Sequence, residues 1–213
     1  MSRKLVVFGA TGGTGRQLVE QALAAGHAVT AVVRRPEAIT MTHPRLTVRR
    51  GDVLDAASVE AAIAGHDVVL SALGSTSPRQ PTTLCRDAVA NMLTAMERCG
   101  VRRIACVSAL ALGDAALLPW PMRLFVRHVL KPLLRHPFAD LLAMEERLRR
   151  SPLEWTIVRP PRLTQGRRTG RVRFAVDAPL PGATTISRAD LADYMLAHID
   201  DPALARALVE VAY

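Results

Sequence analysis

The chain of 213 residues is long enough for one domain with a substantial buried core. Hydrophobic residues make up 49% of it and charged residues 22%, a composition that excludes an intrinsically disordered chain. It holds no apolar run of about 18 residues, the length that a transmembrane helix needs. The apolar stretch after residues 1–4 is too short for a signal peptide.

The chain is strongly basic, with a formal net charge of +9 and a sequence pI of about 10.8. Arginine provides nearly all of this charge, since Lys4 and Lys131 are the only lysines. The arginines are spread along the sequence without a helix-turn-helix or zinc-finger pattern, and aromatic residues are only 4%. We therefore expect no nucleic-acid partner, and instead an attraction for anionic small molecules.

The cysteines and histidines indicate neither disulfides nor a metal site. Cys85, Cys99 and Cys106 are odd in number and lack CxxC spacing, so we expect reduced thiols in a cytoplasmic protein. The six histidines share no metal-ligand spacing, and we assign no metal.

The first half of the sequence alternates strands and helices. Glycines at positions 26, 65 and 100 end the three helices. Apolar runs such as the one after Lys4 in residues 4–8 are typical of parallel strands that are covered on both faces. The predicted strands are residues 4–8, 28–33, 46–50, 67–73 and 103–108, and the predicted helices are residues 14–25, 55–64 and 82–99.

The second half is less regular, because residues 112–137 carry four prolines. After them we predict helices at 140–150 and 189–198, the latter behind a capping box of Ser187 and Asp190, and strands at 155–158, 172–176 and 207–211. This alternation predicts an α/β fold, a Rossmann-like doubly wound parallel sheet with helices on both faces. We expect residues 1–213 to form a single domain with a small C-terminal substrate lobe.

Three glycines lie between the first strand and the first helix, in the stretch FGATGGTG of residues 8–15. Gly9 permits a tight turn, Gly12 lets the backbone approach a ligand, and Gly15 lets the helix pack near the strand. Unpaired N–H groups at the start of that helix favour an anion, most naturally a pyrophosphate. The spacing is GxxGxxG rather than GxGxxG, and no Lys-Ser/Thr pair follows, which excludes a Walker loop.

The second strand ends in Arg34 and Arg35, with no acidic residue. An acid at this point holds the ribose hydroxyls of NAD in dinucleotide-binding folds, whereas arginine accommodates the additional phosphate of NADP. Solvated surface arginines are the alternative interpretation in so arginine-rich a chain. With the glycine loop beside them, we predict NADP(H) as the cofactor.

These segments resemble the atypical short-chain dehydrogenase/reductases with an NAD(P)H-binding domain, and among them the biliverdin-IXβ/flavin reductases. The resemblance runs nearly end to end and leaves the substrate open. It lies in the stretches FGATGGTG (8–15), VVRRPE (32–37), GDVLDAASV (51–59), VVLSALG (68–74), CVSA (106–109), WTIVRPPRL (155–163) and ISRADLADYML (186–196).

The resemblance implies roles for individual residues. Ser108 would lie beside the nicotinamide, where its hydroxyl can hydrogen-bond the acceptor. The 2′-phosphate would meet Arg34 and Arg35. The pyrophosphate would be lined by Gly9, Thr11, Gly12, Gly13, Thr14 and Gly15, and the adenine would be bordered by Asp52 and Val53. The ribose on the nicotinamide side would contact Ala72, Leu73 and Gly74, and the carboxamide would lie between Pro160 and Pro161.

Two departures from the family pattern bear on the chemistry. The only tyrosines, Tyr194 and Tyr213, are not followed by lysine four residues on, so the Tyr-x-x-x-Lys proton donor of the classical enzymes is missing. Arg162 stands where the biliverdin reductases carry histidine after the double proline, which weighs against tetrapyrrole reduction.

Flavins and quinones delocalise the incoming charge and can take their proton from solvent, so they need no dedicated tyrosine. With Ser108 placed by the resemblance and an arginine nearby, the predicted catalytic residues are Ser108 and Arg162, with Arg159 as a second arginine that could stabilise an anionic product. For both arginines, an ion pair with a surface carboxylate is the alternative.

The segment PWPMRLFVRHVLKPLLRHPF, residues 119–138, combines two helical repeats. Apolar residues recur from Met122 to Leu134, while Arg123, Arg127, Lys131 and Arg135 form an i, i+4 series that Pro132 should interrupt. A packed or lid helix, a dimer contact and peripheral contact with a membrane surface are all compatible with this pattern.

Two functions fit the sequence. The first is an NADPH-dependent oxidoreductase that reduces a flavin, quinone or similar conjugated small-molecule acceptor by hydride transfer. The alternative is a non-catalytic NADP(H)-binding redox sensor that acts through a protein partner. The identity of the acceptor and the choice between a monomer and a homodimer stay open.

Overall fold

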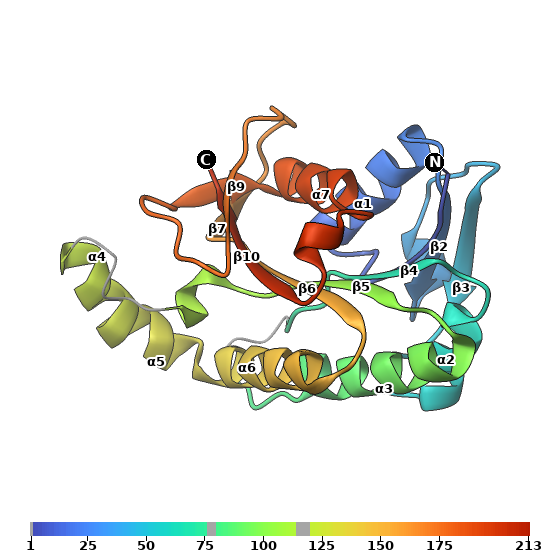
Figure 1. Ribbon diagram of the computed structural model, residues 1–213, viewed down its shortest axis with the longest axis horizontal. Coiled ribbons are helices and arrows are strands. Elements are labelled where there is room, and N and C mark those ends of the chain that lie inside the picture. Colours follow the sequence, from blue (N-terminus) through green and yellow to red (C-terminus); the bar gives the residue numbers. More distant parts are fainter. Residues whose placement is uncertain (1, 76–79, 114–119) are drawn as a thin grey trace.

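A central β-sheet lies between two layers of helices in the computed structural model, which describes residues 2–75, 80–113 and 120–213 (Figure 1). The strand order in the described chain is β3-β2-β1-β4-β5-β6-β10-β8, with only β8 antiparallel to its neighbour. The strands are β1 (Lys4–Phe8), β2 (Ala28–Val33), β3 (Leu46–Arg50), β4 (Val68–Ser71), β5 (Arg103–Val107), β6 (Glu154–Arg159), β8 (Arg173–Val176) and β10 (Ala207–Ala212).

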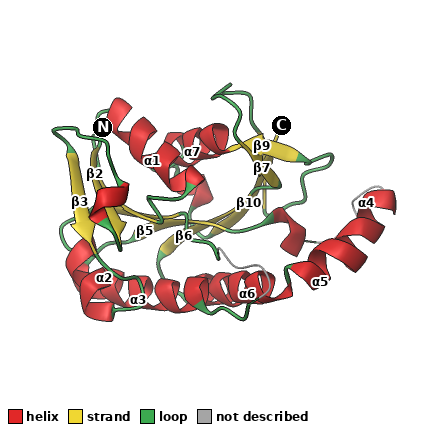
Figure 2. Ribbon diagram, turned by 180° about the vertical axis from the view of Figure 1, so that it is seen from behind, coloured by secondary structure: helices red, strands yellow, loops and turns green. Residues whose placement is uncertain are grey.

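The helices divide between the two faces of this sheet. On one face α1 (Gly13–Ala24) packs against α7 (Arg188–Ala197), and on the other α3 (Leu84–Cys99) packs against both α2 (Ala56–Ile63) and α6 (Arg135–Arg150) (Figures 1 and 2). Short 3-10 turns are η1 (Pro36–Ala38), η2 (Leu110–Leu112) and η5 (Pro202–Leu204).

The central strand shows why the sheet is buried on both sides. Leu5 and Val7 of β1 belong to the apolar cluster under α1 and α7, whereas Val6 and Phe8 belong to the cluster under α2, α3 and α6. All four side chains are fully buried. Because successive residues of a strand point to opposite faces, a strand that is covered on both must be apolar throughout. The predicted Rossmann-like fold is confirmed.

The structure differs from the prediction at several element ends. The fourth strand ends at Ser71 rather than at residue 73, because its neighbour β1 ends at Phe8 and turns at Gly9, which has φ +79°. The sixth helix, α6, begins at Arg135 rather than at residue 140. Two further strands, β7 (Arg162–Thr164) and β9 (Thr185–Ser187), pair in parallel and were not predicted, since three residues carry no readable periodicity.

The buried Asp190 carboxylate holds together the C-terminal lobe around these strands. It accepts hydrogen bonds from the backbone amides of Thr169 and Gly170 at 2.7 and 2.8 Å. It also accepts from the hydroxyls of Ser187 and Tyr213 at 3.0 and 2.5 Å. Burial alone would raise the pKa of Asp190, but these hydrogen bonds hold it below its usual value.

A helical extension precedes α6 and consists of α4 (Trp120–Phe125), the π-helical turn η4 (Val126–Leu130) and α5 (Lys131–Leu133). Pro132 lies in α5, and the chain leaves helical geometry at Leu134, which has φ −103° and ψ 20°. The helix is thus irregular on both sides of Pro132, in the π-helical turn η4 before it and at Leu134 after it, as the sequence predicts, whereas Pro119 lies outside the described residues. Within the described ranges, no helix combines the length and apolar character needed to span a bilayer.

Candidate functional site

The predicted cofactor residues follow the carboxyl ends of adjacent strands, where the strand order reverses between β1 and β4. Gly9 has φ +79°, and a Cβ atom there would lie 2.6 Å from the carbonyl oxygen of Ala72. No larger residue fits this turn. The structure thus brings the glycine loop into contact with the segment Ala72–Gly74, which the sequence assigned to the other half of the same cofactor.

The start of α1 is built from backbone alone. Gly12 is its N-cap, without a side-chain hydrogen bond, and the first turn holds no acidic residue. A Cβ atom at Gly15 would lie 2.0 Å from the carbonyl oxygen of Gly9, so only glycine lets the helix begin this close to the loop. The first amides of α1 have no acceptor within the helix, and they are therefore suited to a pyrophosphate.

Arg188, which the sequence analysis did not single out, lies over this loop. A Cβ atom at Gly13 would be 2.6 Å from the Cδ atom of Arg188 and 2.8 Å from its Nε atom. The guanidinium also donates a hydrogen bond of 3.2 Å to the carbonyl oxygen of Thr164. Arg188 is the first residue of α7, and only the packing of α7 against α1 brings it to the glycine loop.

The carboxyl end of β2 forms a basic corner. Arg34 and Arg35 are exposed, and within the described parts of the chain neither guanidinium forms an ion pair. Arg50, a residue not predicted for the site, ends the neighbouring strand β3 and pairs in register with Val33. Cations thus gather at the position where a 2′-phosphate is expected to bind.

The predicted adenine border lies next to this corner. The carboxylate of Asp52 accepts a hydrogen bond of 3.0 Å from the backbone amide of Leu54, which shapes the turn after β3. The carbonyl oxygen of Val53 accepts one of 3.0 Å from the side-chain amide of Asn91. Asp52 is exposed and Val53 is half-buried, so both remain accessible from the strand ends.

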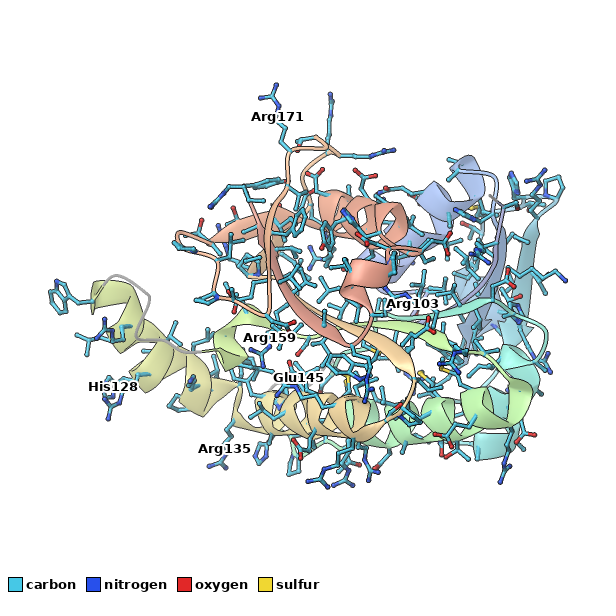
Figure 3. The ribbon with its side chains drawn as sticks, in the orientation of Figure 1. Arg103, His128, Arg135, Glu145, Arg159 and Arg171 are labelled. Carbon is cyan, nitrogen blue, oxygen red and sulfur yellow. The ribbon has the colours of Figure 1, made fainter. Side chains whose placement is uncertain are left out.

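A buried ion cluster surrounds Ser108, which directly follows β5. The hydroxyl of Ser108 donates a 2.6 Å hydrogen bond to the Oε1 atom of Glu145 on α6. Arg159, at the end of β6, binds the same carboxylate through Nε at 2.8 Å and Nη2 at 2.5 Å. Exposures are 6% for Ser108, 1% for Glu145 and 8% for Arg159, and Figure 3 shows Glu145 and Arg159 facing each other.

This cluster refines two expectations. Ser108 was predicted to hydrogen-bond an acceptor molecule, but its proton already lies on a bond to Glu145. Arg159 does pair with a carboxylate, yet the carboxylate is a buried one rather than a surface one. Glu145 was missed because a glutamate in an amphipathic helix carries no signal of its burial.

Two further predicted residues, Pro160 and Arg162, follow the end of β6. The carbonyl oxygen of the buried Pro160 accepts a hydrogen bond of 2.8 Å from Leu110, which connects the end of β6 with η2 after Ser108. Arg162 is exposed at the start of β7 and, in the part of the chain that the structure describes, forms no ion pair with this cluster. The structure does not join Arg162 to Ser108.

Neither tyrosine belongs to this cluster. Tyr194 is 4% exposed and stacks on His198, with ring centroids 4.4 Å apart. Tyr213 donates its hydroxyl to Asp190 in the C-terminal lobe. Both aromatic rings thus serve packing and anchoring.

Two of the cysteines are unreactive, and the described residues offer no metal site. Burial raises the pKa of the Cys106 thiol to about 12 and raises that of Cys85 further, so both stay protonated at neutral pH. No three histidine, cysteine, aspartate or glutamate residues in the described ranges are grouped so that they could hold a metal ion.

Comparison with known proteins identifies the class to which this fold and site belong. Residues 9–202 match the sequence profile of the NAD(P)H-binding family, and the chain belongs to this family. Together with the solved structures below, the match confirms the resemblance to atypical short-chain dehydrogenase/reductases drawn from the sequence. The chain thus has the fold of NAD(P)H-binding oxidoreductases.

Two solved structures and one protein sequence are similar to this chain over most of its length. ChuY, an anaerobilin reductase of Escherichia coli O157:H7, superposes with a TM-score of 0.81 and 26% identity over 98% of this chain and 96% of ChuY. A Burkholderia pseudomallei protein described as exported superposes with a TM-score of 0.80 and 26% identity over 99% and 100% of the two chains. An uncharacterised chloroplastic protein of Arabidopsis thaliana is 30% identical over 181 residues, which are 80% of this chain and 63% of that protein.

Proposed function

We propose that the chain is an NADPH-dependent reductase of a conjugated small-molecule acceptor, such as a flavin or a quinone. The observation that carries the choice of NADPH is the corner after β2, where Arg34 and Arg35 are exposed and no acid ends the strand. A carboxylate there would repel a 2′-phosphate, whereas a guanidinium presents a planar pair of donors to it.

The residues present fit a dinucleotide. The turn at Gly9 and the start of α1 at Gly15 leave no room for side chains, so backbone amides are free to meet the pyrophosphate. A bound reduced nicotinamide supplies the hydride for the acceptor. The chain's own part is to hold both molecules in place, to exclude water and to stabilise the charge that the acceptor gains.

The cluster of Ser108, Glu145 and Arg159 is the group of residues that we propose holds the acceptor. Glu145 holds the Ser108 hydroxyl and the Arg159 guanidinium at the carboxyl ends of β5 and β6. The positive charge of Arg159 offsets the negative charge of the Glu145 carboxylate. A site of this kind can orient an acceptor without a tyrosine proton donor. The likeness to ChuY, which is a reductase, supports the same class of reaction.

The cofactor preference is tested with Arg34→Glu/Arg35→Glu. Charge-assisted hydrogen bonds contribute about 1.5–3 kcal/mol each, so NADPH affinity should fall at least about tenfold while NADH affinity changes little. Calorimetry with both nucleotides measures this. Arg171→Glu, an exposed arginine on the loop after β7, is the control (Figure 3). Equal losses for the two nucleotides would contradict the role of the two arginines.

The acceptor is tested by NADPH oxidation with a panel of flavins, quinones and anaerobilin. Turnover above the background oxidation supports the proposal, and Ser108→Ala should reduce kcat while leaving NADPH affinity unchanged. No turnover across the panel by a protein that binds NADPH would contradict it.

A redox sensor is the second candidate, favoured by one observation: Ser108 and Arg159 are already tied to Glu145. A sensor should bind NADPH and NADP⁺ with different affinities, should not oxidise NADPH with any acceptor, and should retain a partner protein in only one of the two cofactor states. We place either function in a reducing cytoplasm, because Cys85, Cys99 and Cys106 are all free thiols.

A further inference from the structure

Residues 120–134, called the arm below, form the α4–η4–α5 extension before α6. No acidic residue occurs between Asp114 and Asp140, and the arm itself holds no Ser, Thr, Asn or Gln. Its only charged side chains are Arg123, Arg127 and Lys131, with Arg135 immediately after it. The arm is therefore built almost entirely from apolar and basic residues.

Large apolar side chains of the arm are open to solvent. Trp120 is 70% exposed, Leu124 46%, Val129 48% and Leu133 43%, and they follow one another at intervals of four, five and four residues. An interval of five exceeds the about 3.6 residues of an α-helical turn. The residues between Leu124 and Val129 enter the π-helical turn η4, and its wider turn keeps Val129 on the same side of the arm as Leu124.

The arm projects from the body of the molecule. Figures 1 and 2 show α4 and α5 extending beyond α6 at one end, with no helix of the body covering them. In Figure 3, His128 and Arg135 point away from the sheet. Apolar and basic side chains thus occupy a surface on which nothing else in the described chain lies.

We propose that the arm docks on the surface of an anionic lipid bilayer. Such a surface attracts the cationic groups, accepts tryptophan at its headgroup level and buries the exposed apolar side chains. A protein interface normally adds reciprocal hydrogen bonds, for which the arm has no acids, amides or hydroxyls. A second copy would bring two arms of the same charge together. Since no described helix can span a membrane, the arm lies on the bilayer and does not cross it.

The test is co-sedimentation of the full chain with vesicles of phosphatidylcholine alone or mixed with phosphatidylglycerol. We expect at least about tenfold stronger binding to the anionic vesicles, weakened by added salt. Trp155 is buried and is the only other tryptophan, so Trp155→Phe makes Trp120 the sole reporter. Its emission should shift to the blue when anionic vesicles are added.

Three variants separate the contribution of the arm to vesicle binding from the contribution of the overall net charge. Arg127→Glu/Lys131→Glu and, independently, Trp120→Ser/Leu124→Ser should each lose about tenfold or more of the binding. Arg147→Glu/Arg171→Glu changes the net charge as much as the first variant, but at exposed positions on α6 and on the loop after β7, and should bind as the wild type does.

Three results would overturn the proposal. The first is no binding, or equal binding to both kinds of vesicle. The second is an equal loss in Arg147→Glu/Arg171→Glu, which would reduce the effect to net charge. The third is an arm-dependent dimer in light scattering, or capture of an acidic protein, without vesicle binding. NADPH affinity, measured in parallel, tests the proposed function separately.

Discussion

The two ends of the candidate site are built from different chemical groups, backbone at one end and buried side chains at the other. The end proposed to bind the pyrophosphate consists of backbone amides, glycines and exposed guanidinium groups around Gly9, Gly15 and Arg34. The end proposed to face the acceptor consists of buried side chains, Ser108, Glu145 and Arg159, from three separate segments. The first end should therefore respond to substitutions mainly in binding, whereas the second should respond in both stability and turnover.

The largest effect is expected at the buried end. Glu145→Ala would leave the guanidinium of Arg159 buried without its carboxylate, which costs about 3–5 kcal/mol of unfolding free energy. Urea unfolding measures this cost. Replacing both partners, as Glu145→Leu/Arg159→Met, should restore part of it.

The control for this prediction is an exposed ion pair. Arg102 and Glu154 are joined at 3.1 Å with side-chain exposures of 70% and 42%. Arg102→Ala should cost about 1 kcal/mol or less. A similar cost for Arg102→Ala and Glu145→Ala would show that burial does not distinguish the cluster.

At the backbone end, Gly15→Ala should cost about 1–3 kcal/mol of stability, because its methyl group would overlap the carbonyl oxygen of Gly9. The displaced helix start should also weaken NADPH at least about tenfold. Gly65 has φ +77° and no atom near a Cβ, so Gly65→Ala is strained but distant from the loop. It should lose stability with unchanged NADPH affinity; a loss of affinity there as well would mean that affinity only follows folding.

The C-terminal lobe adds a pH-dependent test. Tyr213→Phe removes one donor to Asp190 and should cost about 1.5 kcal/mol at neutral pH. Because the folded-state pKa of Asp190 lies below its unfolded value, this stability is complete above about pH 4 and is lost as the pH falls through the folded value. The difference between wild type and variant should therefore shrink in acid, and a constant difference from pH 7 to pH 3 would argue against the carboxylate.

The smallest effect is expected for Arg188, which joins the glycine loop to the C-terminal lobe because α7 places it over Gly13 and its guanidinium bonds the carbonyl oxygen of Thr164. Arg188→Ala should weaken NADPH by about tenfold or less, since it removes one cation from the phosphate loop. Arg188→Lys should recover part of this loss. Unchanged affinity in calorimetry would assign Arg188 to packing alone.

How much of the site is readable from sequence differs between the two ends. The glycine loop could be predicted, because one strand, one turn and one helix start lie within consecutive residues. The place of Arg34 and Arg35 could be predicted as well, since they follow β2 directly, whereas their role toward a 2′-phosphate stays a prediction. Arg50 could not, because its place beside Val33 depends on the register of β3.

The cluster around Ser108 is much less predictable from the sequence than the glycine loop. Ser108 was predicted from the family resemblance, and its role stays a prediction. Its partner Glu145 lies 37 residues further along the chain, on a helix whose pattern does not mark that position. Arg162 was predicted as catalytic, and its role stays a prediction because the structure leaves it exposed and outside the cluster.

The sequence by itself determined the alternation of strands and helices, the place of the glycine loop and the basic end of β2, because apolar periodicity, glycine and charge act over short stretches of chain. Only the tertiary structure decided that Glu145 is buried against Ser108 and Arg159, that Arg188 covers Gly13 and that the arm stands clear of the body. The physical reason is that burial, ion pairing and exposure depend on which elements pack together, and packing joins residues that are distant in sequence.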